Sequence, residues 1–397
     1  MHKNIKKYIT GLFYLLIAYS YSMYFLLKTA LNLPDNKNLF HIYSGILAII
    51  VTILFAKNYN KIPVRARENG IILSITAILL YGCTSLLYGH INDFYWSYFL
   101  SMGVRFIPAI LAGCLILKNN SIINCIEQSL LIFVSLYTII LSKVVFSAEI
   151  GVNIGDTYNA EGGLNYQTIS YYSVYAFGLT MYILTYNKYP LLLKYILIFL
   201  AFMQILMAIM AGGRGALILS IVLYIYFSFK KRSLIEVVLF LFFTFCAVIL
   251  VKKLLSSNPL FELGYTRIFS FFSDAEAVEN DNRWIRWNLA WKAFLSNPIL
   301  GNGIGSVFYE VGFYSHNILC DILCEGGIVL FLFTSSKLVQ FYKKAKSLIR
   351  LDNKNEIFIV IFLCIYINLM FSGYYLSESG IWMALFYIIH KPSVAYS

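Results

Sequence analysis

Long apolar runs are the feature that most limits what this chain can fold into. About twelve of them follow one another, and most are long enough to cross a bilayer as a helix, which takes about 20 residues. Only 13% of the 397 residues are charged and 60% are hydrophobic, so no segment is polar enough to be a soluble domain, and a cytosolic enzyme is excluded. We therefore predict an all-α fold: a polytopic bundle of about twelve transmembrane helices, with residues 1–397 forming a single membrane domain.

The predicted spans can be bounded from the apolar runs. They are Tyr8–Leu27, Phe40–Ala56, Gly70–Tyr88, Tyr95–Leu117, Ile122–Val145, Thr168–Tyr186, Leu191–Ala211, Gly215–Phe229, Ser233–Val251, Asn317–Ser335, Ile357–Phe371 and Ser377–Ile389. The first run follows three lysines and so resembles a signal peptide. It is too long for one, and no small-residue cleavage site follows it, so we predict a span there.

The basic residues indicate how the chain is oriented. The formal net charge is +12, but the Lys and Arg residues lie between apolar runs and do not form one basic face, so they do not indicate nucleic-acid binding. If the N-terminus is cytoplasmic, every second connection is rich in Lys and Arg, and the last of these is a basic loop at residues 336–355. The positive-inside rule then predicts that this loop and both termini are cytoplasmic.

Function is expected on the outer side, where three segments are long, polar or rich in glycine. They are two outer loops at residues 146–167 and 252–316, and the turn Ala211–Gly215. Soluble nucleotide cofactors are absent from that side. The five histidines and scattered carboxylates contain no metal-ligand set and no Ser/His/Asp motif, so we predict neither a cofactor nor a metal.

Arg214 lies between glycines at the outer junction of two predicted spans. Glycines allow a tight turn that exposes backbone amides, and a guanidinium offers a planar fork suited to phosphate oxygens. A helix that begins near Gly215 would also favour an anion at its N-terminus. The alternative is an interfacial arginine that extends towards lipid headgroups.

Residues 281–298 have the pattern of an amphipathic surface helix. The helix is capped by Asp281 or Asn282 and ends at Pro298. Its apolar arc contains Trp284, Trp287, Trp291 and Phe294, with Arg283 and Arg286 along the border. We expect the indoles to lie in the headgroup layer as an anchor, and the two arginines either to share that role or to hold the diphosphate of a lipid-linked substrate.

His316 and Asn317 open a later span that also carries Asp321 and Glu325. A single histidine is usually structural, but an imidazole near acidic groups at the membrane boundary could take a proton from a sugar hydroxyl. Just before this span, residues 297–306 form a glycine-spaced loop. It is not the dinucleotide fingerprint, because no strand precedes it and the spacing differs.

Arg105 lies inside a predicted span, and a charge there is costly enough that it normally faces a polar cavity. It is therefore a substrate-binding candidate, with pairing to Asp321 or Glu325 as the alternative. Glu161 and Asn165, in the first outer loop, are further substrate-binding candidates or plain loop residues.

The combination of motifs resembles the O-antigen ligase and polymerase superfamily of bacterial envelope glycosyltransferases. Three pieces carry the resemblance: the Gly-Gly-Arg214-Gly turn, the run from Arg286 through Trp291 to Asn297-Pro-Ile-Leu-Gly-Asn-Gly303, and His316-Asn317 followed by Glu325-Gly-Gly327. Each piece is weak alone, and their shared order and spacing are fairly specific. The resemblance implies a bacterial inner-membrane enzyme that moves a glycan from undecaprenyl diphosphate to an acceptor on the periplasmic face, without a metal or a nucleotide sugar.

The resemblance also implies roles for individual residues. Arg214 and Arg286 would hold the donor diphosphate and stabilise it as leaving group, and His316 would act as the base. Asn317 would contact substrate beside His316. We extend substrate contact to Arg105 and Arg283 from their charge and place alone. The expected partners are the undecaprenyl-diphosphate-linked oligosaccharide, membrane lipids and a chain-length regulator protein.

Polymerase and ligase differ mainly in the acceptor, which is a lipid-linked repeat unit for one and lipid A-core for the other. The ligase motif usually continues with a Gly, Thr or Tyr three residues after the position of Gly327, where this chain has Leu330. This departure and the two sizeable periplasmic loops favour the polymerase. A transporter with an anion path lined by arginines is the alternative from another class, but the chain shows no inverted repeat. A non-catalytic envelope scaffold is a further alternative.

Overall fold

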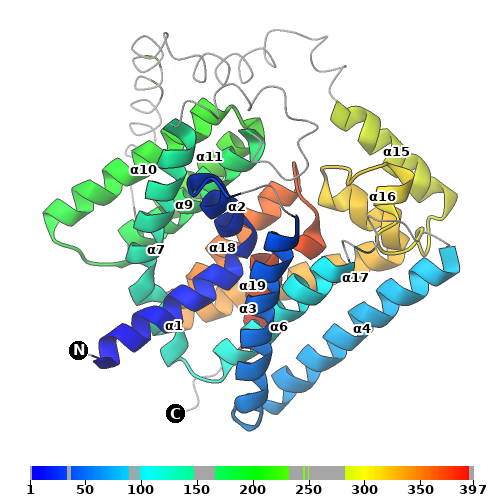
Figure 1. Ribbon diagram of the computed structural model, residues 1–397, viewed down its shortest axis with the longest axis horizontal. Helices are drawn as coiled ribbons and strands as arrows, with labels where there is room; N and C mark the ends of the chain where they lie inside the picture. Colours follow the sequence, from blue (N-terminus) through cyan, green and yellow to red (C-terminus); the bar gives the residue numbers. More distant parts are fainter. Residues whose placement is uncertain are drawn as a thin grey trace. The chain divides into compact units, whose positions relative to one another are not determined.

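In the part of the chain that its computed structural model describes, all regular secondary structure is helical (Figure 1). That part comprises residues 2–33, 37–88, 96, 99–146, 166–231, 245, 249 and 282–392. The prediction of an all-α fold is confirmed. The chain divides into two compact units: unit 1 is Met1–Tyr21, Asn38–Gln128 and Glu279–Ser397, and unit 2 is Ser22–Lys37 and Ser129–Val278. Each unit is described by itself.

Unit 1 is built around the helix α19 (Ser379–His390), which packs against α1, α6, α17 and α18. The helices of this unit are α1 (His2–Ala18), α3 (Lys37–Lys57), α4 (Val64–Tyr88), α6 (Ile107–Leu117), α15 (Asn282–Ser296), α16 (Val307–Glu310), α17 (Ile318–Leu351) and α18 (Glu356–Leu369). The helix α6 is buried on every side from Pro108 to Ile116. An apolar sequence with no polar face predicts this, because such a helix has no side that favours water.

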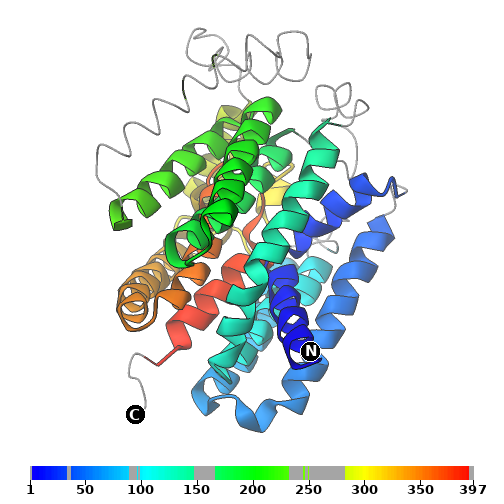
Figure 2. The same ribbon diagram turned by 90° about the vertical axis from the view of Figure 1, so that its left-hand side faces the viewer.

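Unit 2 contains three helices that lie side by side: α9 (Tyr166–Tyr186), α10 (Leu191–Ala211) and α11 (Arg214–Lys231) (Figure 2). Parts of α2 (Ser20–Ala30) and α7 (Ser121–Phe146) complete it. A buried amide joins three of these helices, since Gln204 on α10 donates to Thr138 Oγ1 on α7 and accepts from Thr180 Oγ1 on α9. These three buried side chains are therefore paired with one another, as burial requires.

Five helices of the described residues are long and apolar enough to span a membrane. They are Leu39–Lys57, Phe99–Leu117, Ser121–Val145, Leu191–Ala211 and Ile318–Leu351. These make the chain a multi-pass membrane protein, but the predicted count of about twelve spans is not confirmed. The predicted span Ser233–Val251 lies outside the described residues, apart from two single positions.

Two predicted elements differ from the structure in shape. The first predicted span, Tyr8–Leu27, is not one straight helix, because α1 and α2 meet at a bend of 95°. Ser20, at this bend, shares a hydrogen bond with Ser379 of α19. The segment 336–355, predicted as a loop, is helical as far as Leu351, because it contains neither proline nor glycine and is rich in lysine and leucine, which are good helix formers.

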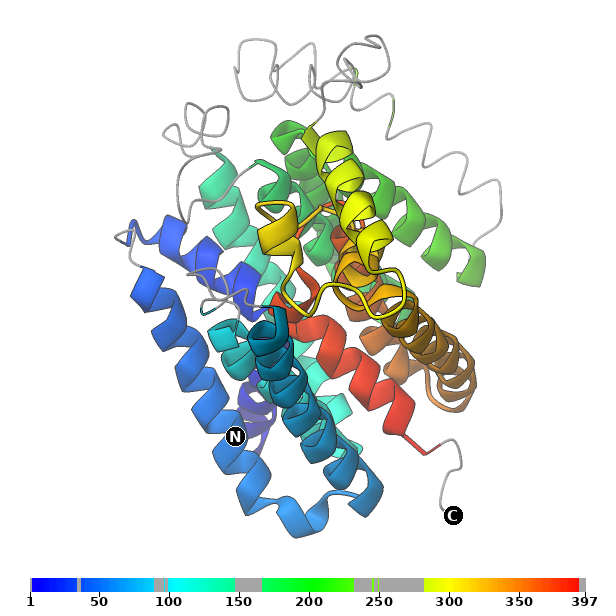
Figure 3. The same cartoon turned by 90° about the vertical axis from the view of Figure 1, so that its right-hand side faces the viewer.

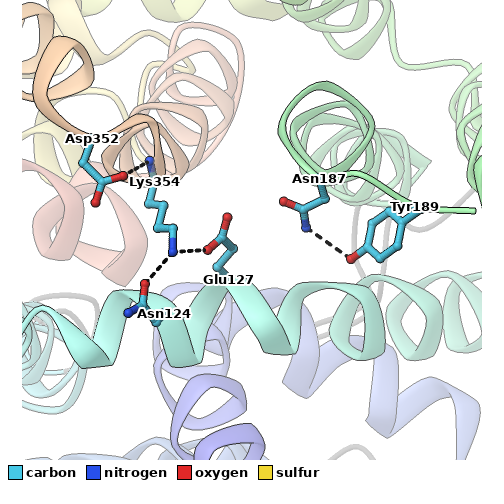
Figure 4. Close-up of polar contacts among 6 residues, drawn as sticks. All are labelled: Asn124, Glu127, Asn187, Tyr189, Asp352 and Lys354. Carbon is cyan, nitrogen blue, oxygen red and sulfur yellow. Dashed lines mark hydrogen bonds and ion pairs between the residues drawn. The ribbon is translucent and has the colours of Figure 1, made fainter.

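Lysine contacts gather at the end of unit 1 where α17 finishes. Lys354 Nζ lies 3.1 Å from Glu127 Oε2 and donates to Asn124 Oδ1 at 2.7 Å, and Asp352 accepts from the Lys354 backbone (Figure 4). Two further lysines make similar contacts between connections: Lys118 donates to Asn58, and Lys391 donates to Asn120. Three connections and the C-terminal segment, all predicted to lie on one side of the membrane, therefore meet at one end of unit 1.

Candidate active site

A glycine loop braces a break in α17 close to the predicted site. Gly327 has φ +59°, which interrupts the helix and leaves backbone groups without their usual partners. The loop that follows α15 supplies them: Asn302 N and Gly303 N donate to the carbonyls of Cys324 and Glu325. In return, the carbonyls of Pro298 and Ile299 accept from the amides of Ile328 and Val329, respectively. The glycine-spaced run is thus a structural brace whose backbone completes the broken helix.

The close approach of this loop accounts for its glycine content. A Cβ on Gly301, where φ is +69°, would lie 2.4 Å from the Glu325 carbonyl carbon. A Cβ on Gly327 would lie 2.5 Å from the Ile299 oxygen. Because no side chain fits at either position, Gly301 and Gly327, which belong to motifs that contribute to the resemblance, are needed for packing two backbone segments together.

His316 is held in an uncommon backbone conformation immediately before α17. Its φ is +64°, and few residues other than glycine adopt such an angle. Asp321 Oδ1 accepts from the Ser315 backbone N–H at 2.9 Å on one side of it. Asn317 caps the helix on the other side, where its Oδ1 accepts from Leu319 N. The turn 315–317 is therefore fixed by side chains on both sides, as is common where strain is kept at a functional site.

Arg286 contacts His316 directly, which joins two of the three predicted catalytic residues. Arg286 Nη1 lies 2.5 Å from His316 Nε2, and its guanidinium also covers the Phe313 ring at 5.1 Å. The helix α15 supplies Arg286, and it packs on α16 and α17 (Figure 3). Since Phe294 and Ala290 of α15 are buried beside the arginines, the cationic side of the helix faces the packed interior.

The opposite side of α15 is exposed and apolar. Trp284 and Trp291 are about half exposed, and Ile285 and Leu295 are exposed as well. The helix predicted at residues 281–298 is confirmed from Asn282 to Ser296. The predicted aromatic arc is not uniform, however, because Phe294 at its edge packs inward and Trp287 is half buried.

The electrostatics around His316 keep its imidazole neutral. Burial, the largest cause, and the nearby charges of Arg286 and Arg283 together lower the pKa of His316 to about 3. A guanidinium can only donate, so His316 Nε2 is the acceptor of the contact with Arg286 and the proton of the neutral ring lies on Nδ1. His316 Nδ1 is buried and has no hydrogen-bond partner among the described residues.

This geometry offers donors to an anion or to a sugar oxygen. Besides His316 Nδ1, the indole Nε1 of Trp287 is buried without a partner among the described residues. Both atoms carry N–H groups, and an unpartnered buried N–H is costly unless a ligand or water accepts from it. Within the described ranges, no three His, Cys, Asp or Glu side chains gather as a metal site would require.

Glu325 belongs to a buried cluster that sequence reasoning did not assemble. Tyr374 and Tyr375 each donate to one of its carboxylate oxygens, at 2.9 and 2.5 Å. The two tyrosines follow Glu325 by about fifty residues, and the pattern of the sequence gives no sign that they would meet it. Asp321, one turn before Glu325, has a buried Oδ2 without a partner in the described part of the chain.

The described partners of Arg105 in unit 1 differ from those of the two acids. Asp321 accepts from Ser315, and Glu325 accepts from the two tyrosines. The Arg105 guanidinium donates to Ser101 Oγ at 3.2 Å and to the Ser377 carbonyl at 3.4 Å. It also lies over the rings of Tyr21 and Phe40, at 5.1 and 4.2 Å. The residues Met102–Phe106 form a π-helix, a local widening that turns this charge inward. These contacts tie four elements together and favour a structural role.

Arg214 is the first residue of α11 in unit 2, directly after the turn that ends α10. Gly212 has φ +76°, the left-handed conformation that ends many helices and that glycine adopts without strain. The predicted glycine turn and helix start are therefore present, one residue earlier than predicted. Arg214 itself is half buried.

Of the remaining candidates, two lie among the described residues and two do not. Asn317 is present as the helix cap described above, and Arg283 lies near enough to His316 to lower its pKa. Glu161 and Asn165 lie outside the described residues, as do most of the predicted loop 146–167 and the first part of the loop 252–316.

Comparison with known protein families gives one match. Residues 196–335 match the family model described as O-antigen ligase. The matched segment is roughly a third of the chain and contains Arg214, Arg286 and His316. No curated protein matches the chain.

Proposed function

We propose that this chain, whose residues 196–335 match the O-antigen ligase family model, is a surface-polysaccharide polymerase of the O-antigen polymerase and ligase superfamily. In this proposal it transfers a growing glycan from undecaprenyl diphosphate to the non-reducing end of a lipid-linked repeat unit. Members of the family are glycosyltransferase-like enzymes, and the match supports this coarser part of the proposal. The domain match does not separate polymerase from ligase.

The preference for the polymerase comes from the sequence after the helix break. Gly327 is followed by Ile328, Val329 and Leu330, whereas the ligase pattern has Gly, Thr or Tyr at the last of these positions. The ligase, which transfers glycan to lipid A-core, is the second candidate, since the matched family model carries that description.

The pairing of Arg286 with His316 is the observation that carries the proposed chemistry. As the anomeric bond to the diphosphate breaks, negative charge grows on the leaving group, and preorganised guanidinium groups can stabilise it without a metal. We assign this role to Arg286, whose guanidinium is fixed by His316 and Phe313, and to Arg214 from the resemblance. Arg283, on the same side of α15, adds positive charge.

The role of His316 in this proposal follows from its hydrogen bonds. With Nε2 engaged by Arg286 and the pKa lowered to about 3, the imidazole is a poor proton acceptor at neutral pH. Its Nδ1–H is available to donate to a sugar hydroxyl or a phosphate oxygen. We therefore assign His316 to orienting a substrate oxygen, in preference to the role of general base that the resemblance implies.

The orientation in the cell is also part of the proposal. The His316 turn precedes α17 and the basic contacts follow it, so the two lie at opposite ends of a helix of 34 residues. With the basic end in the cytoplasm, the site faces the periplasm of the bacterial inner membrane, where the lipid-linked donor is presented.

A lipopolysaccharide gel of a strain lacking this protein tests the proposal. A polymerase predicts lipid A-core that bears one repeat unit, and a ligase predicts bare core with glycan retained on the lipid carrier. An unaltered ladder would exclude both for this glycan. If the protein is instead a transporter of the lipid-linked unit, the strain lacking it would retain undecaprenyl-linked single repeats on the cytoplasmic side. These repeats would be protected from a glycosidase added from outside.

Point variants test whether the Arg286–His316 pair takes part. We expect Arg286→Ala and His316→Ala to abolish the long-chain ladder at normal membrane levels of the protein. Lys292→Ala is the matched control, because Lys292 is a cation on the exposed side of the same helix. A full ladder from Arg286→Ala would remove the catalytic role of the pair.

A further inference from the structure

The turn before Arg214 leaves two backbone groups without a partner inside the helices. The amide of Gly212 donates to the carbonyl of Ile209, so the carbonyl of Ala208 loses the partner that a continuing helix would give it. The amide of Gly213 lies between the end of α10 and the start of α11. Both groups are buried, and each needs a partner from elsewhere.

Ser170 on the neighbouring helix α9 supplies both partners with a single hydroxyl. Ser170 Oγ donates to the Ala208 carbonyl at 2.9 Å and accepts from Gly213 N at 2.9 Å. Its side chain is completely buried. The hydroxyl thus uses its donor and an acceptor position on either side of the turn, and it fixes the backbone of the residue that precedes Arg214.

The space around this contact is equally restricted. A Cβ on Gly213 would lie 2.4 Å from Ser170 Cβ and 2.5 Å from Ser170 Oγ. Gly212 is required for its positive φ, whereas Gly213 is required because the serine occupies the space of a side chain. The two glycines of the motif are therefore required for different physical reasons, and the requirement for glycine at position 213 depends on Ser170.

We propose that Ser170 is a positioning residue that holds the Gly212-Gly213 turn so that the Arg214 guanidinium is directed at the donor diphosphate. The inference rests on the proposed function, in which Arg214 binds that diphosphate. No pattern around Ser170 in the sequence marks it, because it lies about forty residues before the turn and inside an apolar helix rich in tyrosine.

Binding of undecaprenyl diphosphate to the purified full-length protein in detergent tests the proposal. We expect Ser170→Ala to raise the Kd about tenfold, the equivalent of one buried hydrogen bond, without loss of the folded protein. Ser173→Ala is the matched control. Ser173 is also completely buried on α9, but within the described part of the chain its hydroxyl bonds only to the Ile169 carbonyl of its own helix, so its removal should leave the Kd unchanged.

Melting temperatures separate positioning from general stability. A merely structural serine would lower the melting temperature in Ser170→Ala while the folded fraction binds the lipid normally, and this result would overturn the proposal. Two further variants separate the loss of the hydrogen bond from the loss of space beside Gly213. They are the single variant Gly213→Ala and the double variant that combines Gly213→Ala with Ser170→Gly. The double variant restores the space only, so recovery of the wild-type Kd would show that the hydroxyl is dispensable.

Arg214→Ala distinguishes failure of this inference from failure of the proposed function. If Arg214→Ala weakens binding and Ser170→Ala behaves like Ser173→Ala, Ser170 has no positioning role and the proposed function stands. If the wild-type protein does not bind undecaprenyl diphosphate, both are overturned. Matched losses in Arg214→Ala and Ser170→Ala, with normal binding by Ser173→Ala, support the inference.

Discussion

At the scale of single residues, the candidate site combines a neutral imidazole with a strained backbone. His316 pairs with a guanidinium instead of a carboxylate, and this pairing, with burial, drives its pKa downward. A histidine beside an acid would instead gain a proton more easily. The positive φ of His316 costs free energy that the Asp321 and Asn317 contacts offset, so both the charge state and the direction of the ring are set by neighbours.

The pKa of His316 predicts how the protein responds to acid. The folded pKa of about 3 lies below the unfolded value of 6.5, so below pH 6.5 the unfolded state binds the proton and the folded state does not. Stability from this group is present above pH 6.5 and is lost as the pH falls towards 3. At pH 5 the loss is about 2 kcal/mol.

Thermal melting of the detergent-solubilised protein between pH 5 and 7.5 measures this loss. We expect the wild type to lose more stability than His316→Gln, which has no titrating group at this position. Equal pH dependence in the two proteins would show that His316 titrates normally in the folded state.

Asp321 should act on the site through the backbone at Ser315. Asp321→Ala removes the acceptor of the Ser315 N–H and leaves that buried donor unpaired, which costs about 1–3 kcal/mol. Asp321→Asn keeps an oxygen in the same place. We therefore expect the glycan ladder to be lost in Asp321→Ala and largely kept in Asp321→Asn, at matched protein levels in the membrane. Equal loss in both variants would mean that the carboxylate itself is required, as a proton acceptor would be.

At the scale of elements, the site depends on α15 and α17. The loop that follows α15 exchanges backbone hydrogen bonds with α17. The break at Gly327 would be destabilising in an isolated helix, and the loop from Pro298 to Gly303 satisfies it from both sides. Since this loop directly follows α15, the brace also fixes where α15 and Arg286 lie relative to the His316 turn.

Gly301→Ala tests this brace. The added methyl group combines a positive φ with overlap at 2.4 Å on the α17 backbone. Gly312→Ala is the matched control, because Gly312 has φ +77° and no atom of the described residues lies within 4 Å of an added Cβ. We expect Gly301→Ala to be less stable than Gly312→Ala by more than about 2 kcal/mol, measured by denaturant unfolding followed through tryptophan fluorescence. Similar losses would indicate that the loop shifts without cost and does not brace the helix.

The elements also show what could be predicted from the sequence. Apolar runs and caps predicted α10 at its exact bounds and α15 nearly so, because local hydrophobicity and Pro298 determine them. The bend between α1 and α2 has no proline or glycine to mark it. The pairings of Arg286 with His316 and of Glu325 with two tyrosines join residues thirty to fifty positions apart, so only the tertiary structure reveals them. The residue types that carry the chemistry were predictable, and their partners were not.

At the scale of the whole molecule, the lysine contacts and the candidate site lie at opposite ends of α17 in unit 1. Three lysines, Lys118, Lys354 and Lys391, make contacts at one end of this unit, whereas the Arg286–His316 pair lies before the other end of α17. Basic residues retained on one side set the orientation of a multi-pass protein, so this arrangement agrees with the orientation proposed from the charge pattern of the sequence.

Single-cysteine labelling in intact and permeabilised cells tests this orientation. In a background from which the seven native cysteines have been removed, we would place cysteine at the exposed positions Asn60 and Asn353, near the lysine contacts, and at Tyr309, which is 59% exposed near the site. A membrane-impermeant maleimide added from the periplasmic side should label Tyr309→Cys in intact cells, and Asn60→Cys and Asn353→Cys only after permeabilisation. Labelling of Asn60→Cys and Asn353→Cys from opposite sides would contradict the single basic end of unit 1. Labelling of both from the periplasm would instead invert the protein and put the site in the cytoplasm, where a periplasmic polymerase could not act.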